Sequence, residues 1–261
     1  MKKVFFIISF LSLVFLLHSE EKGKLVKSSR IINIGSYRVS IDKYGRIKKI
    51  EREDKIIIKS CYLAGYPIGS GRLWHGGNPP ESFDDEISPT EIFYEKDKII
   101  LKRRGILRNQ KYPEILKYKY EANLYNNGKI NLYYEIEHLV GLKWKAYGPW
   151  LPCNIVLVPG KGWVAERKDE TVKAGIIPSI YSKENIKEFP SISNGAKLRI
   201  GTDFGELEIV AGKNNCLRGY TTKDGKTAVI NTRNYFPGDP QIKKGTRQNL
   251  NLIIKLPKNA E

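Results

Sequence analysis

Short segments in which apolar and polar residues alternate follow one another along most of the 261-residue sequence. The stretch YRVSI at residues 37–41 alternates in this way, and the turn sequence DKYG at 42–45 follows it directly. Alternation with a period of two places the apolar side chains on one face of a strand, and glycine and proline mark the turns. Many such segments, with almost no helical pattern, predict an all-β protein, namely a large antiparallel β-sandwich.

One turn stands out, because Asn126-Asn127-Gly128 separates two long predicted strands at 115–125 and 130–137. Asn and Gly adopt positive φ angles at little cost, so this sequence is typical of a tight β-hairpin. A weak helical pattern is confined to residues 183–188. The remaining predicted strands are 46–51, 55–58, 91–94, 99–103, 155–158, 197–200, 207–210, 227–230 and 250–256.

Residues 1–19 have the layout of a secretory signal peptide. Lys2 and Lys3 precede the run VFFIISFLSLVFLL at 4–17, after which the sequence becomes polar. This run is shorter than the roughly 20 apolar residues that span a bilayer. We therefore expect an exported protein, periplasmic or extracellular, with no transmembrane segment in the mature chain. It would have a flexible lead-in at 20–30 and one β-sandwich domain at 31–261.

The chain is strongly basic, with a formal charge of +17 that falls to +15 when Lys2 and Lys3 leave with the signal peptide. Such a charge favours contact with anionic surfaces, including acidic polysaccharide. The basic residues are scattered, however, and lysine greatly outnumbers arginine, which an AT-rich coding sequence also produces. No nucleic-acid-binding module or basic–aromatic motif is present, so nucleic acid is not an expected partner.

The three cysteines, Cys61, Cys153 and Cys216, are far apart in the sequence. Their spacing matches neither a zinc site nor a disulfide-rich scaffold, and no metal or other cofactor is expected. One disulfide with one thiol left over, or three buried thiols, are both compatible with the sequence.

Three longer segments rich in glycine, proline and aromatic residues interrupt the strand pattern, at 61–89, 141–152 and 233–245. Their aromatic content predicts ordered loops, because disordered segments are poor in aromatic residues. Indole and phenol rings stack on the C–H faces of sugars, and charged groups bind sugar hydroxyls. The predicted carbohydrate-binding residues are Trp74, Trp144, Tyr147, Trp150, Arg218 and Arg233, with core packing of the tryptophans as the alternative.

Four residues are candidates for acid–base catalysis. The strand at 130–138 places Glu135 and Glu137 on one face and Tyr134 on the other. His75, beside two glycines, and Asp239 are the other two candidates. The alternative for the two glutamates is a solvent-facing role in which they pair with lysines, and His75 could instead pack in its loop.

Three stretches resemble the galactose-mutarotase-like β-supersandwich family, which includes aldose 1-epimerases and β-sandwich domains of glycoside hydrolases and polysaccharide lyases. These are the hairpin YRVSIDKYGRIKKIEREDKIII, the central INLYYEIEHLVGLKWKAYGPWLPCNIVLVP and the closing NTRNYFPGDPQIKKGTRQNLNLIIKL. The family's epimerases carry a histidine after the central loop and a glutamate near the closing turn. This chain has Leu151-Pro152-Cys153-Asn154 and, in residues 218–245, no glutamate. The resemblance thus implies the fold and sugar-facing loops, and it argues against mutarotation.

We therefore expect an exported β-sandwich protein that binds or acts on a glycan. Two alternatives remain open: a hydrolase or lyase that uses the acid–base candidates, and a structural envelope protein that binds anionic polymer. A carboxylate within roughly 3 to 6 Å of His75 in one pocket would favour an enzyme. Aromatic side chains without such a pair would favour a binding protein.

Overall fold

The computed structural model describes residues 23–145, 148–179, 192–234 and 239–258, and these residues form strands, turns and loops without a helix. This confirms the all-β prediction. The strands are β1 (Lys24–Leu25), β2 (Arg30–Ile34), β3 (Tyr37–Ile41), β4 (Ile47–Arg52), β5 (Lys55–Cys61), β6 (Ala64–Gly65), β7 (Leu73–Trp74), β8 (Phe83–Tyr94), β9 (Lys98–Arg108), β10 (Leu116–Tyr125), β11 (Lys129–His138), β12 (Leu142–Lys143), β13 (Trp150–Val156), β14 (Gly162–Arg167), β15 (Val172–Ile176), β16 (Ile192–Thr202), β17 (Gly205–Ala211), β18 (Asn215–Thr221), β19 (Thr227–Asn234), β20 (Gln241–Ile242) and β21 (Arg247–Lys255).

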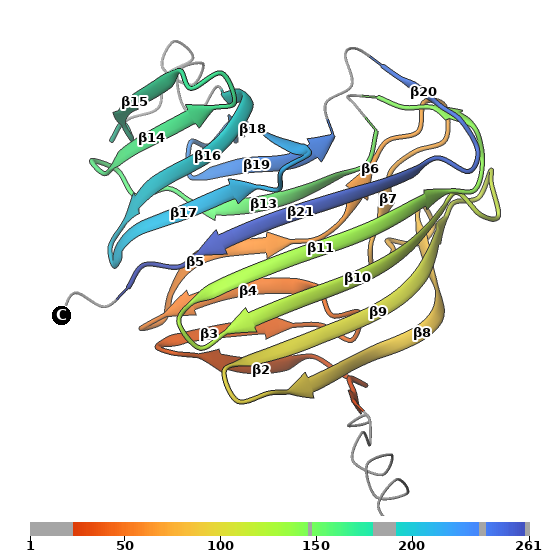
Figure 1. The fold of residues 1–261 in the computed structure, drawn as a ribbon, viewed down its shortest axis with the longest axis horizontal. Coiled ribbons are helices and arrows are strands. Elements are labelled where there is room, and N and C mark those ends of the chain that lie inside the picture. The colour runs from red at the N-terminus through yellow and green to blue at the C-terminus, as the bar shows by residue number, and fades with distance from the viewer. Residues whose placement is uncertain (1–22, 146–147, 180–191, 235–238, 259–261) are drawn as a thin grey trace, which may run out of the picture.

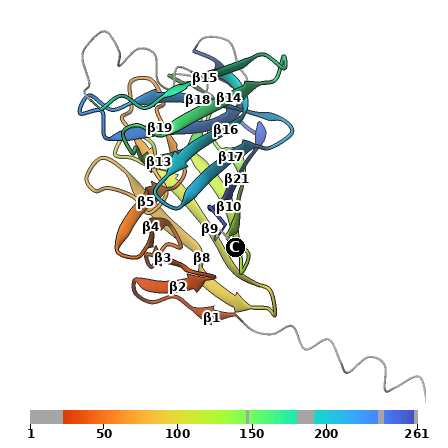
Figure 2. The same cartoon turned by 90° about the vertical axis from the view of Figure 1, so that its left-hand side faces the viewer.

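The strands form two layers of one continuous antiparallel sheet. The larger layer runs β8-β9-β10-β11-β21-β17-β16-β14-β15, and the smaller runs β2-β3-β4-β5-β13-β19-β18 (Figure 1). The pairing of β16 with β18 joins the two layers. In the view turned by 90°, β4 and β5 lie on one side and β10 and β21 on the other (Figure 2). This arrangement confirms the predicted antiparallel sandwich.

The core lies between the layers and follows the alternation of the sequence. In β11 every second residue is buried, including Leu132, Tyr134 and Ile136. The residues between them, among them Glu135 and Glu137, lie on the opposite, partly exposed face. The predicted parity of this strand is therefore confirmed, and it separates the glutamates from the core.

The predicted hairpin is also present. β10 and β11 pair antiparallel through nine residues, from Leu116↔His138 to Leu124↔Ile130. The turn ends at Gly128, whose φ of 81° lies in the region that favours glycine. The Gly128 N–H donates to the Tyr125 carbonyl over 3.0 Å, which closes the turn.

The three aromatic-rich loops meet and are tied together by backbone hydrogen bonds. The Trp144 N–H donates to the Pro240 carbonyl over 2.9 Å, and the Lys145 N–H donates to the Tyr66 carbonyl over 2.8 Å. The short pair β12–β20 joins the second and third loops. Segments from three distant parts of the sequence therefore form one end of the sandwich.

The N-terminal predictions fall partly outside the described residues. The signal peptide at 1–19 and the weak helical pattern at 183–188 both do so. Within the predicted lead-in at 20–30, Lys24 and Leu25 pair with β8, and Val26 is buried. No helix in the described part of the chain is long and apolar enough to cross a membrane.

Candidate functional site

Aromatic rings and guanidinium groups alternate along one surface of the protein. We call the set Tyr44, Arg46, Tyr62, Trp74, Arg72, Tyr66 and Trp150 the aromatic–arginine row. Its side chains come from the turn before β4, the end of β5, the residues around β6 and β7, and the start of β13. All its members are half-buried except Arg72, which is exposed.

Each member of the row contacts the next. The guanidinium of Arg46 lies 5.4 Å from the ring centre of Tyr44 and 5.8 Å from that of Tyr62. The rings of Tyr62 and Trp74 meet edge to face at 6.5 Å. These distances suit cation–π and aromatic contacts, so the first half of the row is a continuous stack.

The second half of the row is built around Arg72. Its guanidinium lies 4.6 Å from the ring centre of Tyr66 and 5.6 Å from that of Trp74. The rings of Tyr66 and Trp150 are stacked at 5.5 Å with an interplanar angle of 22°. Arg72 thus connects Trp74 and, through Tyr66, Trp150, which are two of the three tryptophans predicted to bind sugar.

The two ends of the row differ in charge compensation. Arg46 donates to Asp42 Oδ2 over 2.6 Å and to the His75 carbonyl over 2.8 Å, so a buried carboxylate neutralises it. Arg72 has no carboxylate partner among the residues that the structure describes. The exposed guanidinium between two rings is therefore available to an anionic group of a ligand.

Two predicted arginines lie next to the row. Arg233 on β19 is the register partner of Trp150 on β13, so the two side chains share one face of the sheet. Arg218 on β18 pairs with Asn231, two residues before Arg233, and points to the same face. Of the other predicted residues, Tyr147 lies outside the described residues, and Asp239 is exposed in the third loop.

Trp144 lies beneath this surface. Its exposed fraction is 0%, and its ring contacts His138 edge to face at 5.2 Å. Gly65 makes room for it, because a Cβ atom at that position would lie 2.7 Å from the indole. In this position the indole packs in the core, and a sugar cannot reach its faces.

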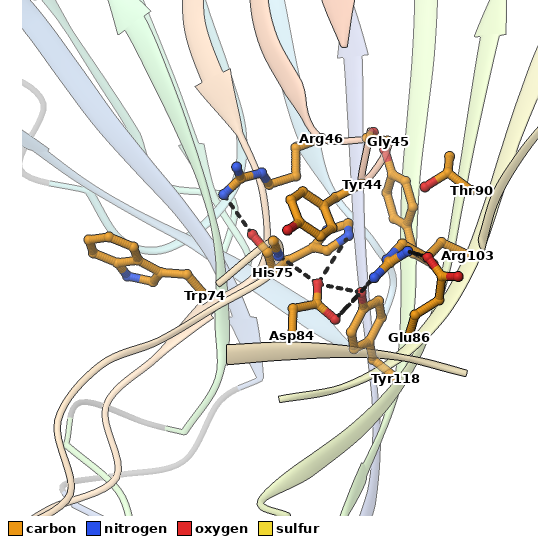
Figure 3. A network of polar contacts seen from close by, with 12 residues as sticks. Tyr44, Gly45, Arg46, Trp74, His75, Asp84, Glu86, Thr90, Arg103 and Tyr118 are labelled. Atoms are coloured by element: carbon orange, nitrogen blue, oxygen red, sulfur yellow. Dashed lines mark hydrogen bonds and ion pairs between the residues drawn. The ribbon is translucent and has the colours of Figure 1, made fainter. Parts of the chain in front are cut away.

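Behind the row, a polar network lies inside the sandwich and reaches solvent at Glu86, whose side chain is 55% exposed (Figure 3). Asp84 accepts hydrogen bonds from the Gly76 N–H at 2.6 Å and from the Tyr118 hydroxyl at 2.8 Å. Arg103 lies 3.4 Å from Asp84 Oδ1, and it donates to Glu86 Oε2 and to the Tyr118 hydroxyl, each at 3.0 Å. The Asp84 side chain has an exposed fraction of 0%, so this ion pair is shielded from solvent.

His75 is the centre of an aromatic cage within this network. Its ring packs on Tyr118 at 4.9 Å and Tyr120 at 5.1 Å, and its Nδ1 lies 2.7 Å from the Tyr134 hydroxyl. The Tyr134 hydroxyl and the imidazole are thus hydrogen-bond partners in the interior. The closest carboxylate oxygen is Asp84 Oδ2, 4.0 Å from Nε2.

Burial governs the protonation states in the network. It lowers the pKa of His75 well below its usual value, and the charges of Arg103 and Arg46 add to this effect. Burial also raises the pKa of Asp84, which the charge of Arg103 and the hydrogen bonds from Gly76 and Tyr118 partly offset. His75 is therefore neutral near pH 7, and it contributes hydrogen bonding and packing to the interior.

His75 and Asp84 meet the distance expected of an acid–base pair but not its accessibility. Both side chains have an exposed fraction of 0%. A general acid or base must reach its substrate within hydrogen-bond distance. In this arrangement the pair stabilises the interior beneath Trp74.

Glu135 and Glu137 lie on the outer face of the larger layer, away from His75. Glu135 Oε1 lies 3.0 Å from Lys119 Nζ, and Glu137 Oε2 lies 4.0 Å from Arg247 Nη2. Glu135 also lines a pocket of about 540 Å³ with Lys102, Arg104, Glu121 and Tyr133. Because Tyr134 faces the core and contacts His75, these glutamates on the opposite face cannot share a site with His75.

The described residues hold no cluster suited to a metal ion.

Sequence reasoning missed Asp84 and Arg103. The signal that could have found them is the parity of β9, in which Leu101, Arg103, Gly105 and Leu107 all face the core. A charged residue in such a series requires a buried partner. Gly105 leaves the space for it, because a Cβ atom there would lie 2.5 Å from Asp84 Oδ1.

Known proteins similar to this chain are found by comparing structures and not by comparing sequences. No family model matches the sequence, and no curated protein matches it. The structure is similar to galactose 1-epimerase from Lactobacillus acidophilus NCFM, with 9% sequence identity, a TM-score of 0.53 and coverage of 88% of this chain and 93% of that chain. It is also similar to the alpha-N-acetylgalactosaminidase NagBb from Bifidobacterium bifidum, with 8% identity and a TM-score of 0.53 over 89% of this chain and 36% of that one.

A third similar structure is the GH36 alpha-galactosidase AgaA from Geobacillus stearothermophilus, with 9% identity and a TM-score of 0.51. The match covers 89% of this chain and 41% of the galactosidase chain. At such identities the likeness concerns the fold. The chain thus has the galactose-mutarotase-like β-sandwich fold that its sequence resembles.

Proposed function

We propose that this protein binds carbohydrate at the aromatic–arginine row. The observation that carries the proposal is the half-exposed series of rings from Tyr62 to Trp150, with the Arg72 guanidinium between them. Flat rings accept the C–H faces of sugars, and guanidinium groups donate to hydroxyl and carboxylate oxygens. The fold supports the proposal, since two solved structures of this fold are named for action on galactose-type sugars.

The preferred ligand in this proposal is an acidic saccharide. Arg72 has no carboxylate partner among the described residues, and two further basic residues, the exposed Arg218 and the buried Arg233, lie on neighbouring strands of the same face. A uronic acid or a sulfated sugar would place its anionic group near Arg72 while its ring stacks on Trp74 or Trp150. The formal charge of +15 that remains without Lys2 and Lys3 adds attraction for such a polymer at a distance.

Binding without chemistry is the form of the proposal that the site geometry favours. The closest histidine–carboxylate pair, His75 and Asp84, is buried, and the outer-face glutamates are engaged by basic residues. We also propose that the protein acts outside the cytoplasm, because residues 1–19 have the layout of an export signal.

The test is a glycan array followed by titration calorimetry with the best neutral and the best acidic ligand. Trp74→Ala and Trp150→Ala should each weaken binding by about 1 to 3 kcal/mol, by analogy with bases stacked on aromatic rings. Arg72→Ala should weaken binding of the acidic ligand and leave binding of the neutral ligand nearly unchanged. Binding of the acidic ligand should also weaken between low and high salt, because salt screens the charges.

The matched control is Tyr94→Ala, which removes a ring that is 50% exposed on β8, outside the row. This variant should bind like the wild type. Equal binding by the wild type and both tryptophan variants, with folding verified by thermal denaturation, would exclude the row as the sugar site.

A further inference from the structure

Two of the three cysteines lie opposite each other across neighbouring strands. Cys61 is the last residue of β5, and Cys153 lies in the middle of β13. The antiparallel register pairs them directly, with Asn154↔Ser60 as the next pair. Their exposed fractions are 2% and 0%, so both side chains point to the same buried face.

The geometry of this pair suits a covalent bond. Directly opposed residues in antiparallel strands have Cα atoms about 4.5 to 5.5 Å apart, and disulfides join Cα atoms about 4.4 to 6.8 Å apart. The two thiols are adjacent, because the Cys153 thiol is the neighbouring group that, besides burial, raises the pKa of Cys61. Burial, together with this neighbour, raises the pKa of Cys61 well above its usual value, so the reduced pair is held as thiols.

Cys216 is excluded from such a bond by its place in the sheet. It lies on β18, which is separated from β13 by β19. Its register partner on β19 is Arg233, whereas that of Cys153 is Ile230. Two strand spacings correspond to roughly 10 Å, beyond the reach of a disulfide without movement of the backbone.

We propose that Cys61 and Cys153 form an intramolecular disulfide by exchange with a low-molecular-weight disulfide such as oxidised glutathione. In this exchange the two thiols lose two protons and two electrons, and one S–S bond forms between them. The donor's S–S bond breaks, and the donor takes up the same electrons and protons to leave as two thiols. Cys216 remains a free thiol.

The bond would cross-link a seam whose register is short. β5 and β13 share the register pairs Cys153↔Cys61, Asn154↔Ser60 and Ile155↔Ile58, with an irregularity between the last two. This seam joins the strands β2–β5 to the β13–β19 part of the smaller layer. The inference concerns the fold alone and does not depend on the proposed carbohydrate site.

The experiment uses the full chain, unfolded in urea with a reductant and then refolded with or without oxidised glutathione. Thiols counted after denaturation should number three per chain without the oxidant, matching the three cysteines, and should fall to one with it. Peptide mapping should find the Cys61 peptide joined to the Cys153 peptide. The melting temperature should rise by about 10 °C, as expected for closing a loop on the order of 100 residues.

The control variant Cys216→Ser should still form the bond and retain no free thiol. A Cys61→Ser variant should form no intramolecular disulfide. Should that variant fail to fold, peptide mapping of the wild-type protein still identifies which cysteines are joined. Three thiols after refolding with oxidised glutathione, or a bond that includes Cys216, would overturn the proposal.

Discussion

Asp84 and Asp85 are neighbours in the chain with opposite surroundings. Asp84 is sealed in the interior with Arg103, whereas the Asp85 side chain is 50% exposed and pairs with Arg108. Asp84→Ala leaves the buried Arg103 guanidinium paired with Glu86 alone among the described carboxylates, and the Glu86 side chain is 55% exposed. The free energy of unfolding should therefore fall by about 3 kcal/mol, the lower end of the cost of breaking a buried ion pair. Asp85→Ala should cost less than about 1 kcal/mol, because solvent screens an exposed pair. Urea denaturation of the two variants measures the difference, and equal losses would contradict the buried network.

The pH dependence of stability follows from the buried histidines. Burial lowers the pKa of both His75 and His138, so the unfolded chain takes up protons before the folded protein does. Their contribution to stability is complete above pH 6.5, the usual histidine value, and is lost as the pH falls below it. Asp84, whose pKa is raised, acts with the opposite sign, because its folded form binds the proton more tightly.

We therefore expect the free energy of unfolding to fall between pH 7.5 and pH 5.5, by at most about 1.4 kcal/mol per pH unit for each histidine. His75→Gln keeps an acceptor for the Tyr134 hydroxyl and removes one of the two titrating groups. Its stability should depend less on pH than that of the wild type in urea denaturation at both pH values. An unchanged slope would mean that His75 titrates normally in the folded protein.

The residues of the candidate site were only partly predictable. Trp74, Trp150, Arg218 and Arg233 could be found because their residue types suit sugars, and the structure places them on or beside one surface. Trp144 has the same residue type, but its loop packs under Gly65, a close approach that depends on residues far away in the sequence. Residue type alone therefore could not separate the surface tryptophans from the core one.

At the scale of the element, strands with strict alternation were predictable and the others were not. β3 has the predicted bounds 37–41, and β11 extends the predicted strand by one residue at each end. β8 begins eight residues before the predicted start at 91. The prediction missed its first half because that half is charged and contains register shifts between Glu86 and Ser88 and between Ser88 and Glu91. β14, β15 and β18 were missed, since glycine and charged residues interrupt their alternation.

The short elements of the loops depend on their partners. β6, β7, β12 and β20 contain two residues each, too few for any periodic pattern. They exist because the three loops pack together, as in the pairing of Leu142 with Ile242. The sequence could predict aromatic, ordered loops, but it held no signal for these long-range pairs.

For the molecule as a whole, the fold class was predictable and the order of strands was not. Alternation and turn residues report local geometry, whereas the pairing of β5 with β13 or of β16 with β18 joins distant segments. Only the resemblance to a known family carried information on that arrangement.

Export is the prediction that concerns the whole chain. When the chain is produced in a bacterial host that recognises the signal, the protein recovered outside the cytoplasm should begin near Ser19-Glu20. Intact-mass measurement checks this, because loss of residues 1–19 lowers the mass of the chain by the mass of that segment. Exported protein that still contains Met1 to Leu17 would show that the segment remains as an anchor. A variant with Lys2 and Lys3 replaced by Glu is the control, because it lacks the positive start that such signals use.

The position of β21 has a consequence for how the chain is made. This strand is the last of the described strands along the chain, yet it lies inside the larger layer, between β11 and β17 (Figure 1). During synthesis, neither neighbour can complete its hydrogen bonds until residues 247–255 have left the ribosome. The growing polypeptide therefore has an open sheet edge along β11 until β21 emerges, and the larger layer can close only then.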